Sequence, residues 1–182
     1  LIRLNKKSIK KTYSNNVFCT IHRRENFGKN LETICKHVIY LSKKFPKLNF
    51  KFVAHPNQNI KKFLPKYIKS TKNLTIIRPL NFLDSLNYIF SAKAIITDSG
   101  GIQEEVTTLN KYCLVVRKKT ERIESIKSKN CILTDLKRNN FVNNFQKTLY
   151  RNNKNIKKNF SLNKVFGDGY ASDKILKILK AL

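Results

Sequence analysis

Residues 93–105 read KAIITDSGGIQEE, and this stretch decides the fold. Its apolar, β-branched first half predicts a buried strand that ends at Asp98. Ser99-Gly100-Gly101 follows at once and predicts a turn into a helix, because serine caps helices and glycine lets a ligand approach the backbone. In open α/β sheets, ligands bind beyond the carboxyl ends of the strands. The stretch therefore predicts a strand, a turn and a helix, with a ligand site at the turn.

The same alternation of apolar runs and helical patterns extends over the rest of the chain. The other predicted strands cover residues 16–21, 48–55, 73–79, 112–117 and 130–134. The longer predicted helices cover residues 30–45, 82–92, 139–150 and 171–182. Short β-branched runs that alternate with helices favour an α/β fold with a doubly wound parallel sheet of Rossmann-like type. The chain has 182 residues and no long linker, so we expect a single domain over residues 1–182.

The net charge is +27, which would suit binding to nucleic acid or to an anionic membrane surface. The lysines, however, are scattered from end to end and form no single arm or stripe. Lysine, asparagine and isoleucine all dominate the chain, and A/T-rich codons encode all three. We therefore favour compositional drift over a polyanionic partner, and we do not expect nucleic acid to be the ligand.

The cysteines at positions 19, 35, 113 and 131 form no CxxC pair, so we expect no zinc site and no other metal. Three of them lie in apolar stretches, which is typical of buried, reduced thiols in a cytoplasmic protein. The chain has no run of 18 apolar residues and no signal-peptide core at its start, so we expect no membrane span. It also contains no methionine, which predicts a processed or partial start.

Four segments differ from the lysine-rich composition of the rest of the chain: HRREN (22–26), TDSGGIQEE (97–105), TERIE (120–124) and FGDG (166–169). They contain no lysine, yet they hold seven of the eleven acids and four of the five glycines. Such a contrast indicates that chemistry, rather than drift, sets the residues in these segments.

The turn at residues 99–101 offers a phosphate site, because a helix N-terminus carries unpaired N–H groups and a partial positive charge. Ser99 can either add a hydroxyl to that site or cap the helix. Glu104 and Glu105 on the first turns are poor phosphate ligands, but an acid can accept hydrogen bonds from ribose hydroxyls. The alternative is an ordinary capped helix whose acids face its positive end.

HRREN follows a predicted strand at the same edge of the sheet. His22 can transfer a proton or bind phosphate. Arg23 and Arg24 can pair with phosphate, and Glu25 can orient them. The alternative is a surface cluster of ion pairs. Arg122 in TERIE can reach a diphosphate from a third strand end, or it can simply begin a charged helix.

Two further residues fit structural roles better than catalytic ones. His55 follows a strand in His55-Pro56-Asn57, and an isolated histidine is more often structural. Asp168 in FGDG is expected to cap the final helix through its backbone N–H groups.

In this order, HRREN, HPN, TDSGGIQEE, TERxE and GDGxAS resemble the non-hydrolysing UDP-N-acetylglucosamine 2-epimerases, over residues 16–182. The resemblance implies the C-terminal half of a two-domain, GT-B-type fold, with residues 170–182 as the terminal return helix and the N-terminal domain absent. It implies interconversion of UDP-GlcNAc and UDP-ManNAc by elimination and re-addition of UDP, without cofactor or metal. It also implies a cytoplasmic enzyme that is a homodimer when complete.

The resemblance assigns roles to individual residues. His22 matches the active-site histidine, and Glu25, Arg24 and Glu121 would support the site. Arg23 and His55 match positions used for a second, allosteric UDP-GlcNAc. The residues matched to UDP contacts are Ser85, Ser99, Gly100, Gly101, Glu105 and Arg122.

The chain departs from the family pattern at several positions. Ser85 stands where an aromatic residue usually lies near the uracil, and Ile123 stands where proline is usual. Lys118-Lys119 replaces Asp-Thr, which adds positive charge beside the expected UDP site. The principal catalytic carboxylates of the family belong to the first domain, so we expect this chain to be inactive alone. Rival interpretations are the donor half of a GT-B glycosyltransferase and a basic nucleic-acid-binding module.

Overall fold

The computed structural model of the chain describes residues 14–54, 64, 71–155 and 162–181. Six strands form one parallel sheet in the order β3-β2-β1-β4-β5-β6. This order is that of a doubly wound, Rossmann-like sheet, so the predicted fold class is confirmed. The strands are β1 (Asn16–Thr20), β2 (Asn49–Val53), β3 (Leu74–Ile77), β4 (Ala94–Thr97), β5 (Cys113–Val116) and β6 (Cys131–Thr134).

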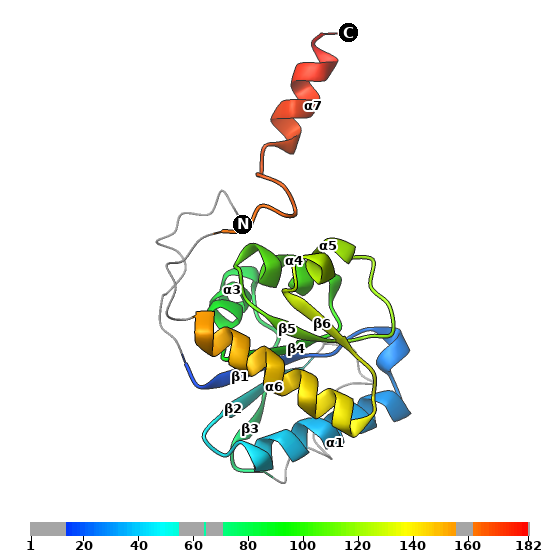
Figure 1. The fold of residues 1–182 in the computed structure, drawn as a ribbon, viewed down its shortest axis with the longest axis vertical. Helices are drawn as coiled ribbons and strands as arrows, with labels where there is room; N and C mark the ends of the chain where they lie inside the picture. The colour runs from blue at the N-terminus through cyan, green and yellow to red at the C-terminus, as the bar shows by residue number, and fades with distance from the viewer. Residues whose placement is uncertain (1–13, 55–63, 65–70, 156–161, 182) are drawn as a thin grey trace.

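Helices cover both faces of the sheet (Figure 1). They are η2 (Arg24–Asn26), α1 (Lys29–Lys44), α3 (Phe82–Ser91), α4 (Gly100–Thr108), α5 (Ile123–Lys127), α6 (Arg138–Asn155) and α7 (Ala171–Leu179). The four helices whose bounds were predicted, α1, α3, α6 and α7, begin within one residue of the expected position and end within five. The short helix η2 lies in the HRREN segment, which was predicted as a loop. A short lysine-rich helix expected after residue 57 falls outside the described residues.

Two apolar cores hold the layers together. On one face, α1 and α6 pack on the sheet through a cluster that includes Phe50, Phe141 and Phe145, all fully buried. On the other face, α3, α4 and α5 cover a second cluster around Phe18 and Ile95. β4 and β5 are buried at every position because helices cover both faces of the sheet. As is typical of such strands, all their residues except Thr97 are apolar.

The strand order reverses between β1 and β4. From β1 the chain builds outward to β2 and β3 on one side, and from β4 to β5 and β6 on the other. The loops that follow β1 and β4 therefore leave the sheet side by side with helices on opposite faces. Such a switch point forms a crevice at the carboxyl edge, which is where ligands bind in this class of sheet.

Helix α7 lies apart from the sheet and its covering helices (Figure 1). None of its residues is buried, and Ile175, Leu176, Ile178 and Leu179 are between 51% and 64% exposed. Asp168 accepts hydrogen bonds from Lys174 and from the backbone N–H of Tyr170, the residue before the helix. No side chain caps the N-terminus of α7, so the expected cap by Asp168 is not formed, although Asp168 does contact the start of the helix. Among the described residues, no helix is long and apolar enough to cross a membrane.

Candidate nucleotide-binding site

The loops after β1 and β4 start from neighbouring positions in the sheet. Thr20 is the register partner of Thr97, and their hydroxyl oxygens are 3.0 Å apart. HRREN follows the first strand and DSGG follows the second. The structure therefore brings two of the predicted motifs together at the switch point.

Asp98 fixes the HRREN loop in place. It is fully buried, and its carboxylate accepts hydrogen bonds from the backbone N–H of His22 at 3.1 Å and of Arg23 at 2.9 Å. It also accepts from the side-chain amide of Asn26 at 2.9 Å, and that amide donates to the carbonyl of Val116. Sequence reasoning treated Asp98 only as the end of a strand. The missed signal was an acid separated by only one residue from the apolar run 94–96, where a buried carboxylate must find donors.

Two arginines converge on the start of α4. A methyl group on Gly100 would lie 3.4 Å from Nη2 of Arg23 and 3.6 Å from Cζ of Arg122. Ser99 caps the helix, since its hydroxyl accepts from the backbone N–H of Ile102 at 3.4 Å. The N-terminus of α4 and the two guanidinium groups thus lie around Gly100, and all three favour a bound anion.

Acidic side chains pair with both of these arginines. Arg122 pairs with Glu104, and Nη2 of Arg23 lies 3.9 Å from Glu121. Glu121 also receives two hydrogen bonds from the buried Arg117, and these lower the pKa of Glu121 to about 2. The network keeps both guanidinium groups near Gly100.

Arg117 was not predicted as a site residue, yet it links two of the motifs. Its side chain is 6% exposed and donates to Glu25 in HRREN as well as to Glu121 in TERIE, both at 2.8 Å. Its pKa is raised above the usual value, chiefly by the hydrogen bonds to Glu121. Glu25 and Glu121 are therefore linked to each other through Arg117, and Glu121 also lies near Arg23.

Glu105 lies one residue after Glu104 in α4. Its Oε2 atom is buried and has no hydrogen-bond partner in the described part of the chain. Burial, and secondly the charge of Glu104, raises the pKa of Glu105 to about 7. A ligand hydroxyl that donates to this oxygen would satisfy it, which agrees with the predicted role as a ribose acceptor.

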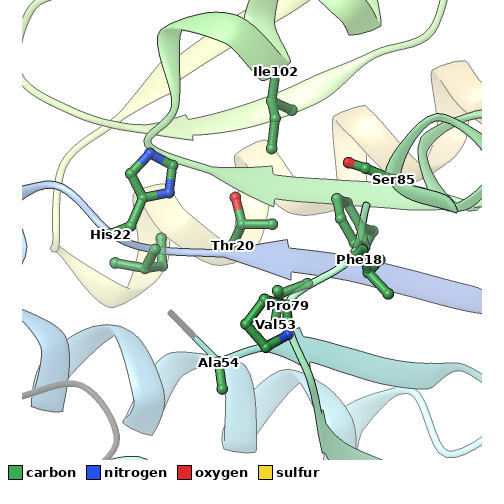
Figure 2. Close-up of a pocket in the computed structure, with 10 residues that line it drawn as sticks. Phe18, Thr20, His22, Val53, Ala54, Pro79, Ser85 and Ile102 are labelled. Carbon is green, nitrogen blue, oxygen red and sulfur yellow. The ribbon is translucent and has the colours of Figure 1, made fainter. Parts of the chain in front are cut away.

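A small cavity of about 170 Å³ lies beside His22. Figure 2 shows the His22 ring at one end of the lining side chains and Ser85 at the other, with Thr20 between them in this view. Phe18, Pro79 and Ile102 give the cavity apolar walls. An apolar slot that ends in a few polar groups suits a flat heterocyclic base.

Lys118 and Lys119 do not line the cavity beside His22. They line a separate cavity of about 540 Å³ with Glu25, Arg117 and Asp135, at the carboxyl ends of β5 and β6. The expectation that they add charge beside the UDP site stays a prediction. Both are exposed.

Two residues that were predicted for the site are not found among these contacts. Arg24 is exposed at the start of η2, and its side chain forms no hydrogen bond or ion pair with another described residue. His55 lies outside the described residues. Arg23, expected at an allosteric position, lies near Gly100 together with Arg122, and its allosteric role stays a prediction. No group of three His, Cys, Asp or Glu side chains gathers as metal ligands in the part of the chain described here.

Sequence comparison identifies relatives over most of the chain. The family model described as UDP-N-acetylglucosamine 2-epimerase matches residues 2–180. The UDP-N-acetylglucosamine 2-epimerase of Yersinia pestis is 34% identical over 164 residues, which make up 90% of this chain and 43% of that protein. The enzyme of Campylobacter jejuni is 32% identical over 163 residues, or 90% of this chain and 42% of that protein. The chain thus spans less than half the length of these curated relatives.

Solved structures agree with this result. The UDP-GlcNAc 2-epimerase of Neisseria meningitidis bound to UDP-GlcNAc superposes with a TM-score of 0.82 at 31% identity, covering 93% of this chain and 45% of that chain. The Methanocaldococcus jannaschii enzyme in complex with UDP-GlcNAc and UDP superposes with a TM-score of 0.77 at 26% identity, covering 100% of this chain and 50% of that chain.

Proposed function

Because the chain belongs to the UDP-N-acetylglucosamine 2-epimerase family, we propose that it is the UDP-binding half of an enzyme that interconverts UDP-GlcNAc and UDP-ManNAc. The diphosphate lies at the start of α4, between Arg23 and Arg122. The ribose hydroxyls donate to Glu105, and the uracil enters the cavity that Ser85 lines. Two relatives of this fold, from Neisseria meningitidis and Methanocaldococcus jannaschii, carry UDP-GlcNAc in their solved structures, which supports this assignment.

The convergence of Arg23 and Arg122 on Gly100 is the observation that carries the proposal. A diphosphate needs concentrated positive charge, and Glu104 and Glu121 hold both arginines in position before it arrives. When the phosphates bind, they compete with these carboxylates for the guanidinium groups. Glycine at position 100 keeps space open between them for phosphate oxygens.

The reaction has two stages that this site can serve in part. UDP is first eliminated from the sugar to leave a glycal, and it then adds back with the opposite configuration at C2. The arginines and the helix N-terminus stabilise the negative charge that grows on the departing diphosphate. His22, at the mouth of the cavity, is placed to exchange a proton with the bound UDP-sugar.

We propose that the complete enzyme adds a first domain whose inner edge closes over this crevice and supplies the base that removes the sugar proton. The relatives are more than twice as long as the matched segment. Helix α7 presents an exposed apolar face that requires a partner surface. We propose that this helix returns to the first domain, that the whole enzyme is a cytoplasmic homodimer, and that Arg23 and His55 also serve a second, regulatory UDP-GlcNAc.

Titration of the labelled chain with UDP tests the nucleotide site. Amide signals of residues 99–102 and 122 should shift together. Arg122→Ala should weaken UDP binding by about 1.5–3 kcal/mol, the range for a charged hydrogen bond, or roughly 10- to 150-fold in Kd.

Arg151→Ala is the matched control for that titration. It removes the same charge at the opposite edge of the sheet, where Nη1 of Arg151 donates to the carbonyl of Lys129 at 3.0 Å before β6 begins. Equal losses in both variants would mean that UDP responds to net charge and not to this site. Absence of any shift at residues 99–102 would rule out the nucleotide site.

A further inference from the structure

Two polar residues of the sequence motifs have no part in the proposed nucleotide contacts. Gln103 belongs to TDSGGIQEE, and Thr120 belongs to TERIE. Gln103 is fully buried in α4, and Thr120 is half-buried in the loop between β5 and α5. A buried amide needs hydrogen-bond partners, so the partners of Gln103 indicate what this residue does.

Gln103 connects the turn at residues 99–101 to the loop that carries Arg122. Its Nε2 atom donates to the backbone carbonyl of Ser99 at 3.1 Å. Its Oε1 atom accepts from the hydroxyl of Thr120 at 2.7 Å. The oxygen of that hydroxyl accepts in turn from the backbone N–H of Arg122 at 3.1 Å. Three hydrogen bonds therefore join Ser99 to Arg122 through two side chains.

The two ends of this series of hydrogen bonds fix its direction. A backbone carbonyl can only accept, so the Gln103 amide turns its NH₂ group toward Ser99 and its oxygen toward Thr120. A backbone N–H can only donate, so the Thr120 oxygen accepts from Arg122 and its hydroxyl proton is left for Gln103. Only one arrangement of the protons satisfies all three hydrogen bonds, which favours a single, rigid geometry.

We propose that Gln103 and Thr120 are positioning residues that hold the backbone of Arg122 beside the turn at residues 99–101. Glu104 pairs with the guanidinium group at the other end of the arginine. When a diphosphate competes with Glu104 for that group, the backbone anchor remains and keeps the arginine within reach of the turn. The consequence for UDP binding rests on the proposed function, whereas the positioning of the backbone does not.

Two substitutions of Thr120 separate its hydroxyl from its shape. Thr120→Val removes the hydroxyl at nearly constant volume, and Thr120→Ser keeps it. In calorimetric titration, Thr120→Val should weaken UDP binding by about 3- to 10-fold, the change for one hydrogen bond, while Thr120→Ser should bind like the unaltered protein. Thr33→Val is the matched control, because the Thr33 hydroxyl donates to the carbonyl of Lys29 at 2.9 Å in α1, on the other face of the sheet.

A double-mutant cycle shows whether Thr120 acts through Arg122. In an Arg122→Ala background, Thr120→Val should cause no further loss of UDP affinity, because the guanidinium group that it positions is gone. An equal further loss in that background would overturn the proposal, since Thr120 would then affect binding by another route. Thr120→Ser that binds UDP as weakly as Thr120→Val would overturn it as well, because the hydroxyl would not be the group that matters.

Relaxation of ¹⁵N in the ligand-free chain tests the positioning without UDP. The order parameter of the Arg122 backbone N–H should be about 0.85, the value for a rigid backbone, and should fall in Thr120→Val but not in Thr120→Ser. The substitution lies in a loop, so the rest of the backbone spectrum should remain that of the folded protein. An unchanged order parameter in Thr120→Val would contradict the positioning role. If UDP does not bind but the order parameter falls as expected, the proposed function is wrong and the positioning role stands.

Discussion

Glu105→Gln should make the protein more stable at neutral pH and a poorer binder of UDP. The pKa of Glu105 is raised from 4.5 to about 7 because burial disfavours its charge and Glu104 repels it. A folded-state pKa above the unfolded value means that the folded state holds the proton more tightly. The stability from this group is therefore fully present below pH 4.5 and is lost as the pH rises through about 7.

The size of the effect follows from that difference in pKa. At about 1.4 kcal/mol for each pH unit, the full difference would be roughly 3 kcal/mol. Glu105 keeps partial contact with solvent, so screening reduces the expected loss to about 1–2 kcal/mol. Glutamine carries no charge and avoids this loss. It also accepts ribose hydroxyls less strongly than a carboxylate, so UDP affinity should fall by about 1–3 kcal/mol.

Urea unfolding at pH 5, 6, 7 and 8 measures the first effect, and calorimetric titration with UDP measures the second. The stability advantage of Glu105→Gln should be small at pH 5 and reach its full size by pH 8. Glu124→Gln, an exposed acid on α5, should show neither the pH-dependent gain nor the loss of affinity. Parallel pH profiles for the unaltered protein and Glu105→Gln would refute the reasoning, because they would mean that Glu105 bears no cost of ionisation.

The remaining predictions concern the whole chain and its charge. The purified chain should not epimerise UDP-GlcNAc, and a separately produced first domain should restore activity. Sustained conversion by the chain alone, abolished by His22→Ala, would contradict this, because it would mean that this chain holds the catalytic groups assigned to the first domain. If the +27 charge reflects drift, binding to nucleic acid should be weak and should collapse between about 50 and 200 mM salt, whereas sequence-selective binding that survives the higher salt would contradict this. Removal of residues 171–181 should improve the solubility of the isolated chain, as measured by its aggregation threshold, because it removes the exposed apolar face of α7; an unchanged threshold would mean that this face is already covered by a second copy.

The sheet and its helices could be predicted because local patterns are strong in this chain. The apolar runs that become β1, β4 and β5 are buried almost completely, so their composition shows in the sequence. The order of the strands could not be read in the same manner, since it depends on contacts between distant segments. The general rules for α/β sheets and the family resemblance predict only that the sheet is parallel and doubly wound, not the order of its strands.

The site was predicted in part for a related reason. Ser99, Gly100 and Arg122 stand out because they interrupt a lysine-rich sequence, and they meet as expected. Asp98 and Arg117 were missed because their importance lies in their partners, which a single sequence does not reveal. Glu104 and Glu105 look alike in the sequence, yet one is held by Arg122 and the other has an unpartnered buried oxygen.

The hydrogen bonds of Asp98 also bear on the order in which the protein assembles. His22 and Asp98 are 76 residues apart in the chain, and Glu25 and Arg117 are 92 apart. Contacts between such distant residues close large loops and form late in folding. During synthesis the segment after β1 emerges long before its acceptor, so it must wait for β4 and β5 before it can take its final shape. A nascent chain stalled before residue 98 would already contain the histidine and both neighbouring arginines, but it would have nothing to arrange them.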